Sequence, residues 1–193
     1  MILTKLSYLN KTNYLKIFKF IKKQNLYYFE TAEEICKSVF SLEKKWKLKK
    51  FFSLLSYNDL CKETLAEQFY LQKKGTYRAI KENIDNKELY KSSKKMKAYL
   101  LGLMLTQILW PSHYRILSFY RTKLKFEKGI KFLEVGSGHG LLTKYLLKNN
   151  FQNEGTICDI SKQSLDLTKS TIQKKTNLKK IKFVNKDFFY LNS

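Results

Sequence analysis

Apolar side chains recur at intervals of three and four residues through the first part of the chain, which is the spacing of one helix face. Thr31 and Glu34 have the spacing of a capping box, so a helix is predicted to begin there. The apolar run Tyr99–Trp110 predicts a more deeply buried helix, and Pro111 is expected to end it because proline lacks a backbone N–H. Residues 1–128 are therefore predicted to form a helical N-terminal region.

The pattern changes at Gly129. Three short apolar runs follow, each with the length of a strand, and they stop at glycine, aspartate and asparagine. Two segments with helical spacing lie between them, and Ser161 is suited to cap the second. The order strand, helix, strand, helix, strand predicts an α/β fold with a parallel sheet and right-handed crossovers in residues 129–193. The predicted strands are Ile130–Val135, Thr156–Cys158 and Ile181–Val184.

The formal net charge is +22, and lysine supplies most of it, since the sole arginines are Arg78, Arg115 and Arg121. Lysine is abundant together with asparagine, isoleucine, phenylalanine and tyrosine, the residues of AT-rich codons, and the lysines are spread along the whole chain. A nucleic-acid surface gathers charge on one face, so we interpret this charge mainly as solvated faces and keep nucleic acid as an alternative partner. The segment Lys44–Phe51 mixes lysine with aromatic residues, as proteins that bind single strands do. Its apolar positions also fit one face of a helix, which is the favoured interpretation.

The three cysteines, Cys36, Cys61 and Cys158, lie far apart and form no CxxC pair. Their number and spacing fit reduced thiols in a cytoplasmic protein and predict neither a disulfide framework nor a metal site. Lysines interrupt the first residues, so no signal peptide is predicted, and the run Tyr99–Trp110 is too short to span a bilayer. We expect a cytoplasmic protein without a membrane partner.

A glycine loop follows the first predicted strand and precedes a predicted helix, and it reads Glu134-Val135-Gly136-Ser137-Gly138-His139-Gly140. Glycine lets a backbone approach a ligand closely, and the helix that follows adds its positive N-terminal end. A dinucleotide fingerprint would require glycine where Leu141 stands, and no Gly-Lys-Ser/Thr sequence follows to make a Walker loop. The loop therefore predicts a ligand site of another kind.

The pattern acidic-x-Gly-x-Gly-x-Gly resembles the first motif of the class I S-adenosylmethionine-dependent methyltransferases. Two further matches follow at the spacing which that family shows, Asp159 at the end of the second predicted strand and Asp187-Phe188 after the third. A carboxylate at the position of Asp159 can accept hydrogen bonds from both ribose hydroxyls of an adenosine. The resemblance covers Lys131–Phe188 and implies a Rossmann-like domain with S-adenosylmethionine as its cofactor.

The resemblance also implies roles for individual residues. Glu134 would orient the methionine end of the cofactor, and Ile160 would lie against the adenine. Asp187 and Phe188 would contact the adenine edge, and a tyrosine on the helix that enters the domain would help to cover the cofactor. No catalytic residue is implied, because in-line attack on a sulfonium methyl group needs no obligatory protein group. The implied cofactor-binding residues are Glu134, Gly136, Ser137, Gly138, Gly140, Asp159, Ile160, Asp187, Phe188 and Tyr114.

The family's sheet has seven strands, whereas this sequence supplies the first three, so the first strand is expected to form an exposed apolar edge. We therefore expect an incomplete Rossmann-like methyltransferase domain and favour truncation relative to the family. The alternatives are a second polypeptide that completes the domain or a helical region that covers the exposed edge. The favoured function is methyl transfer to a small-molecule acceptor with residues 1–128 as an acceptor lid, and the activity of the chain alone is left open. Two alternatives stay open: a basic protein that binds or methylates nucleic acid, and an inactive cofactor-binding fragment or partner subunit.

Overall fold

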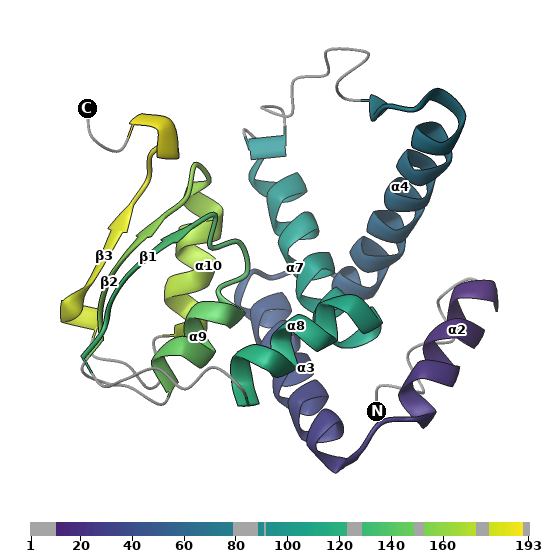
Figure 1. The fold of residues 1–193 in the computed structure, drawn as a ribbon, viewed down its shortest axis with the longest axis horizontal. Helices are drawn as coiled ribbons and strands as arrows, with labels where there is room; N and C mark the ends of the chain where they lie inside the picture. Colours follow the sequence, from purple (N-terminus) through teal and green to yellow (C-terminus); the bar gives the residue numbers. More distant parts are fainter. Residues whose placement is uncertain are drawn as a thin grey trace. The chain divides into compact units, whose positions relative to one another are not determined.

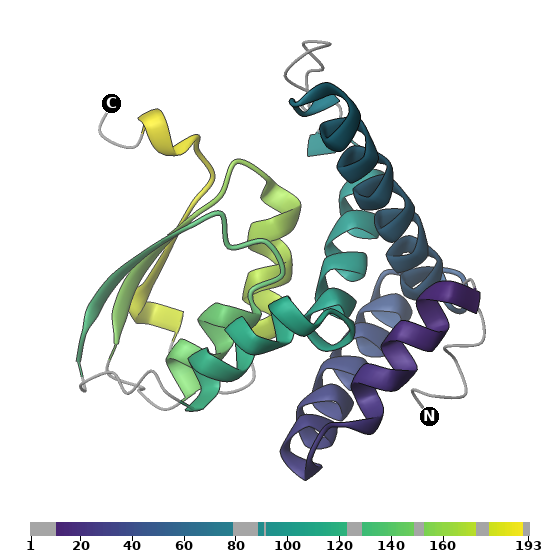
Figure 2. The ribbon, with the colours of Figure 1, turned by 45° about the vertical axis from the view of Figure 1, so that its right-hand side comes forward.

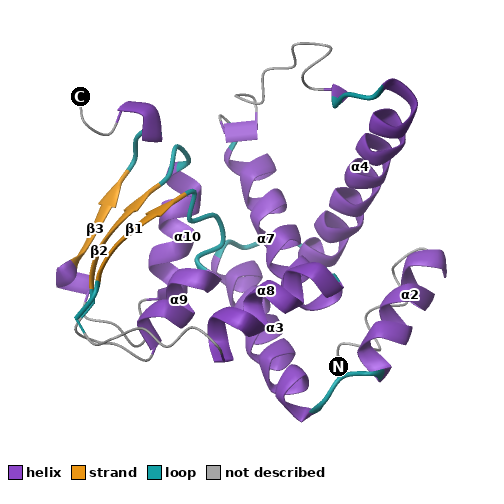
Figure 3. Cartoon of the chain, viewed as in Figure 1, coloured by secondary structure: helices purple, strands orange, loops and turns teal. Residues whose placement is uncertain are grey.

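Helices make up the first part of the chain and a small sheet with helices the second, and the two units divide between Trp110 and Pro111 (Figure 1). The computed structural model describes residues 11–78, 89–90, 92–122, 129–148, 153–172 and 178–190. Figure 3 shows the same division by type of secondary structure. The second unit opens at Pro111, whereas the sequence pattern changes only at Gly129, so the helix between these positions belongs with the sheet. Each unit is described by itself below.

The described helices of the first unit are α2 (Lys11–Lys22), α3 (Leu26–Lys45), α4 (Phe52–Lys74) and α7 (Ser93–Leu109). Helices α4 and α7 pack against each other and converge toward one end, as Figures 1 and 2 show from two directions, and α3 also packs against α7. Gly102 permits the close approach of α4, since a Cβ there would lie 3.1 Å from the carbonyl oxygen of Ser56. The buried helix predicted at Tyr99–Trp110 is confirmed, and its fully buried side chains include Leu100, Leu101, Met104 and Ile108.

The start of α3 differs from the prediction. Asn25 caps this helix, and its side chain accepts a hydrogen bond from the backbone N–H of Tyr28 at 3.1 Å. Thr31 lies inside the helix, where its buried hydroxyl donates to the carbonyl oxygen of Tyr27 at 2.8 Å. The predicted capping box at Thr31 is therefore wrong, because an earlier asparagine already satisfies the helix end.

The segment Lys44–Phe51, named the lysine corner below, joins α3 to α4, so the predicted helix face is wrong here. Helix α3 ends in a Schellman motif, in which the N–H of Leu48 donates to the carbonyl oxygen of Glu43 at 2.9 Å. Lys47 and Phe51 both have left-handed backbone conformations, with φ of 52° and 63°. Each conformation costs roughly 1 kcal/mol relative to glycine. The turn at the lysine corner therefore includes two residues with strained backbone conformations.

Glu43 caps the next helix from a distance. Its buried carboxylate accepts a hydrogen bond from the backbone N–H of Ser53 at 2.7 Å and another from the Ser53 hydroxyl at 2.6 Å. Phe51 occupies the N-cap position of α4 but offers no side-chain acceptor. The Glu43 carboxylate therefore accepts from a backbone N–H in the first turn of α4 that the N-cap residue cannot bind. These hydrogen bonds connect the end of α3 to the start of α4.

Replacing Glu43 with alanine is expected to lower the free energy of unfolding of the first unit by about 2 kcal/mol, because the buried donors of Ser53 lose their acceptor. Glu33→Ala is the matched control, since it removes a carboxylate from the same helix whose side chain is 62% exposed. Tryptophan fluorescence during urea unfolding measures both variants, because Trp46 and Trp110 both lie in the first unit. Equal losses for the two variants would contradict the capping role.

The second unit contains a parallel sheet and helices. Its strands have the order β1-β2-β3, and β1 is at the edge. Helices α9 and α10 lie on one face of the sheet (Figure 2). The predicted α/β fold with parallel strands is confirmed. The elements are α8 (Pro111–Thr122), β1 (Lys131–Val135), α9 (Leu141–Lys148), β2 (Glu154–Cys158), α10 (Lys162–Ile172), η2 (Leu178–Lys180), β3 (Ile181–Val184) and η3 (Phe188–Tyr190).

The two faces of the sheet differ in how they are covered. The face toward α9 and α10 is packed around a core formed by Leu147, Ile157, Leu165, Ile172 and Ile181. The other face leaves the side chains of Leu133 and Val135 55% and 47% exposed. Among the described strands, β1 pairs with β2 alone. The expected exposed apolar edge is therefore confirmed.

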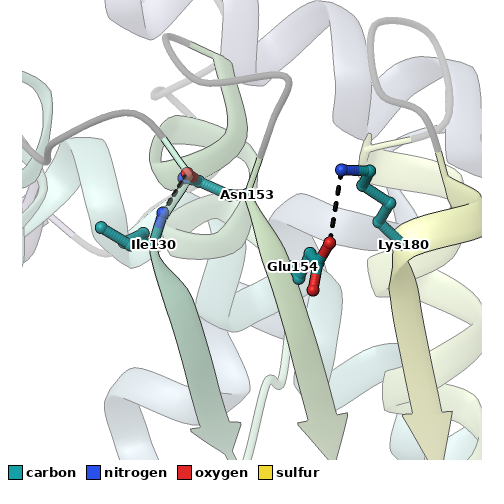
Figure 4. Close-up of polar contacts among 4 residues, drawn as sticks. All are labelled: Ile130, Asn153, Glu154 and Lys180. Atoms are coloured by element: carbon teal, nitrogen blue, oxygen red, sulfur yellow. Dashed lines mark hydrogen bonds and ion pairs between the residues drawn. The ribbon is translucent and has the colours of Figure 1, made fainter.

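Side chains also join the amino ends of the strands (Figure 4). The backbone N–H of Ile130 donates to Oδ1 of Asn153 at 3.2 Å, and Nζ of Lys180 lies 3.3 Å from a carboxylate oxygen of Glu154. These contacts link the starts of β1, β2 and β3. They hold the register of the sheet at the end opposite the glycine loop, and the carboxyl ends are left for other contacts.

Candidate site at the carboxyl ends of the strands

The carboxyl ends of the three strands meet around the glycine loop. The N–H of Gly136 donates to the carbonyl oxygen of Cys158 at 2.8 Å, which carries the pairing of β1 and β2 past the strand ends. The N–H of Asp159 donates to the carbonyl oxygen of Val184 at 3.1 Å, and the side chain of Asn185 donates to the carbonyl oxygen of Asp159 at 2.9 Å. The structure thus brings the glycine loop, Asp159 and the end of β3 together, as parallel strands in this order require.

The glycine loop turns sharply after β1. Gly136, Gly138 and Gly140 have φ of 73°, 53° and 70°, values that glycine adopts without strain. Their N–H groups all donate within the protein at 2.8 to 3.1 Å, and the acceptors are the carbonyl oxygen of Cys158, Oδ2 of Asp159 and the carbonyl oxygen of Ser137. A phosphate-binding loop turns such N–H groups toward its ligand. This loop is therefore not arranged as a phosphate cradle.

The predicted loop residues have different surroundings. A Cβ at Gly136 would meet no atom within 4 Å, so the backbone there is open to a close neighbour. A Cβ at Gly140 would lie 2.7 Å from the Cα of Thr168, so this glycine serves the packing of α10. Ser137 is buried, and its hydroxyl accepts a hydrogen bond from the Thr168 hydroxyl at 3.0 Å. Gly136 therefore leaves open space beside the loop, while Ser137 and Gly140 hold the loop on α10.

Two carboxylates flank the glycine loop. Asp159 is 7% exposed, and its oxygens accept the N–H groups of Gly138 at 3.1 Å and Ser161 at 2.8 Å. Glu134 accepts a hydrogen bond from the Thr143 hydroxyl at the start of α9. Burial raises the pKa of Glu134, the Thr143 hydrogen bond opposes this shift, and the nearby charge of Asp159 adds to it. Two carboxyl groups therefore lie beside the glycine loop of a strongly basic chain.

Apolar side chains stand exposed at the ends of β2 and β3. Ile160 is 49% exposed and Phe188 is 47% exposed. Asp187 lies between β3 and η3, where its Oδ1 accepts the N–H of Phe189 at 3.1 Å. Tyr114 is nearly fully buried on α8, a helix that packs against α9. Ile160 and Phe188 thus present apolar surface after β2 and β3, whereas Asp187 accepts a hydrogen bond that shapes η3.

His139 belongs to the site's framework, although the glycine pattern did not single it out. Its imidazole is buried, and Nδ1 accepts the N–H of Leu141 at 3.1 Å, so it caps the start of α9. Thr171 of α10 donates to the carbonyl oxygen of His139 at 3.3 Å. Burial, with a smaller contribution from His113, lowers the pKa of His139 to about 4. A polar residue just before a predicted helix is the one sequence signal for this capping role.

The described residues contain no group of three or more His, Cys, Asp or Glu side chains placed to hold a metal ion. Over the same ranges, no helix has the length and apolar content that crossing a bilayer requires. No protein-family model, curated protein or solved structure matches the chain. The function proposed below therefore depends on the geometry of the site and on the resemblance of its motifs.

Proposed function

We propose that the second unit binds S-adenosylmethionine at the carboxyl ends of its strands and that its function is methyl transfer. One observation carries this proposal: the three glycine N–H groups are bonded inside the protein while Glu134 and Asp159 flank the loop. A phosphate group would meet two carboxylates and no glycine N–H donor. A nucleoside with a positive charge is the better match, because an opposite charge beside a carboxylate is favourable.

The residues present suit the parts of this cofactor. The open backbone at Gly136 allows a close approach to the loop. Each carboxylate oxygen has more than one lone pair, so Asp159 can accept from ribose hydroxyls while it keeps its two backbone donors. The exposed side chains of Ile160 and Phe188 supply apolar surface for a planar base.

When bound, this cofactor supplies a methyl group on a positively charged sulfur, which is already electrophilic. The residues of the chain would then contribute binding, orientation and exclusion of water. Glu134 would orient the charged methionine end of the cofactor. No side chain is proposed as a catalytic base.

Methyl transfer also requires an acceptor, for which we propose a small molecule. The exposed side chains of Leu133 and Val135 and the unpaired edge of β1 leave this side of the sheet uncovered. A further strand on that edge would pair with the backbone of β1, and a helix connected to it could cover the face that carries both side chains. We propose that transfer needs such a strand from another polypeptide segment, whereas cofactor binding needs only the described site.

Gly136→Ala is expected to raise the Kd for S-adenosylmethionine about tenfold or more, because the added methyl group would occupy the open space beside the loop. Gly129→Ala is the matched control: its φ is 78°, no atom lies within 4 Å of the added Cβ, and it sits at the opposite end of β1. Its Kd is expected to stay within about twofold of the original chain. Both substitutions carry a similar backbone strain, so a difference in Kd reports the ligand site.

Isothermal titration calorimetry with S-adenosylmethionine and S-adenosylhomocysteine measures these constants. Adenosine diphosphate is the comparison ligand, and it is expected to bind more weakly than either because its phosphates face the carboxylates. No heat with either sulfur compound would overturn the proposal. Tighter binding of the diphosphate, or equal Kd values for Gly136→Ala and Gly129→Ala, would also overturn it.

A further inference from the structure

The lysine corner gathers positive charge on a short, exposed turn. Five of its eight residues are exposed lysines, namely Lys44, Lys45, Lys47, Lys49 and Lys50. The neighbouring carboxylate, Glu43, is buried and turned toward Ser53, so it does not share the outer surface of the turn. The five ammonium groups therefore lie at the end of α3 and along the loop that follows it. On an ordinary solvated helix face, lysines would instead be distributed along the length of the helix.

The backbone of the lysine corner is strained at a lysine. Lys47 takes the left-handed position of the Schellman motif, which glycine commonly fills. Strained backbone positions gather at functional sites, where the strain forms part of a prepared surface. A charged side chain therefore stands at a strained position, beside four further exposed lysines.

Two aromatic rings accompany the lysines. Trp46 and Phe51 are both half-buried, so each keeps part of its ring at the surface. Nζ of Lys97, from α7, lies 5.3 Å from the centre of the Trp46 ring, and Nζ of Lys50 lies 5.1 Å from the centre of the Phe51 ring. Cations beside accessible aromatic rings are the combination that proteins use to bind single-stranded nucleic acid.

The composition of the lysine corner disfavours a membrane surface. Within the lysine corner no large apolar side chain is exposed, and Leu55 on α4 is the nearest one in sequence that is. A segment that inserts into a bilayer presents several apolar side chains on one face, whereas lysines alone give only electrostatic attraction to anionic headgroups. A polyanion that stays in water, and whose bases can stack on rings, is the better match.

We propose that the lysine corner binds single-stranded nucleic acid, with its lysines contacting phosphates and Trp46 stacking against a base. This surface lies in the first unit and the cofactor site lies in the second, so the inference does not depend on the proposed methyl transfer. Under this proposal, part of the +22 net charge has a local binding function. From composition alone, the same charge was interpreted as lysines on solvent-exposed surfaces.

The test replaces Lys44, Lys45, Lys49 and Lys50 with glutamine in the full chain. Lys47 is kept because its backbone conformation ends α3. The matched control replaces the exposed lysines Lys16, Lys19, Lys73 and Lys74 with glutamine, which removes the same charge from α2 and α4. Fluorescence anisotropy with labelled oligouridylate and oligothymidylate measures the Kd at several salt concentrations. Circular dichroism checks that both variants keep their helices.

The corner variant is expected to bind about tenfold or more weakly than the original chain, with a shallower salt dependence, while the control changes by about threefold or less. Trp46→Leu is expected to weaken binding about threefold or more without changing the salt dependence, because it removes stacking and no charge. Equal losses in the corner and control variants would overturn the proposal, since the charge would then act diffusely. Tighter binding to duplex DNA, or loss of binding to phosphatidylserine vesicles with oligonucleotide binding unchanged, would overturn it as well.

Discussion

Gly140→Ala is expected to lower the free energy of unfolding of the second unit by about 3 kcal/mol. A Cβ at this position would lie 2.7 Å from the Cα of Thr168, a backbone atom that no change of rotamer can move away. Alanine would also have to adopt a φ of 70°. The strain of this conformation adds roughly 1 kcal/mol to an overpacking cost of about 2 kcal/mol. Helix α10 must therefore shift away from the glycine loop.

Gly129→Ala separates the two contributions, because its φ is 78° and its added Cβ meets no atom within 4 Å. A loss of only about 1 kcal/mol is expected for this control. Residue-resolved NMR during urea unfolding follows α9 and α10, whereas tryptophan fluorescence reports the first unit, where both tryptophans lie. Similar losses for the two variants would show that the loop does not pack closely on α10.

The second unit is expected to lose about 3 kcal/mol of stability through His139 as the pH falls from 7 to 4. Burial lowers the pKa of this imidazole from 6.5 to about 4. In this window the unfolded chain binds a proton that the folded unit does not, so the stability is fully present above pH 6.5 and is lost below it. Glu134 acts in the opposite direction, because its raised pKa makes the folded state take up a proton first as the pH falls.

His139→Asn is the matched variant for this pH dependence, since an amide oxygen can accept the N–H of Leu141 without titrating. Between pH 7 and pH 4, the unfolding free energy of this variant is expected to fall by about 3 kcal/mol less than that of the original chain. Urea unfolding followed by NMR at several pH values measures this difference. The chain has two histidines, so an NMR titration of His113 and His139 also gives the pKa directly. A His139 resonance that titrates near pH 6.5 would contradict the prediction.

Local patterns predicted the second unit well. The third strand has the predicted bounds Ile181–Val184, and the other two strands lie within two residues of their predicted starts. Ser161 caps α10 as predicted, and its hydroxyl accepts the N–H of Ser164 at 3.2 Å. These features depend on neighbours in sequence: an apolar run, a residue that ends it and a hydroxyl before a helix.

Local patterns failed at two helix ends in the first unit. Thr31 was expected to start a helix, but Asn25 supplies the cap. The lysine corner was expected to form a helix face, but its chain turns at Lys47 and Phe51, and Glu43 accepts hydrogen bonds from Ser53 across the turn. A carboxylate that caps the following helix from ten residues away leaves no signature in the spacing of apolar residues.

The sequence by itself determined the order of strands and helices and the position of a glycine loop between the first strand and its helix. It also placed an acidic residue at the end of the second strand. Only the tertiary structure decided how each loop residue is used: Gly136 faces open space, while Gly140 meets Thr168. The physical reason is that the three glycines share a left-handed local conformation. What distinguishes Gly140 is its neighbour Thr168 on α10, a helix that packs on the loop only when the sheet has formed.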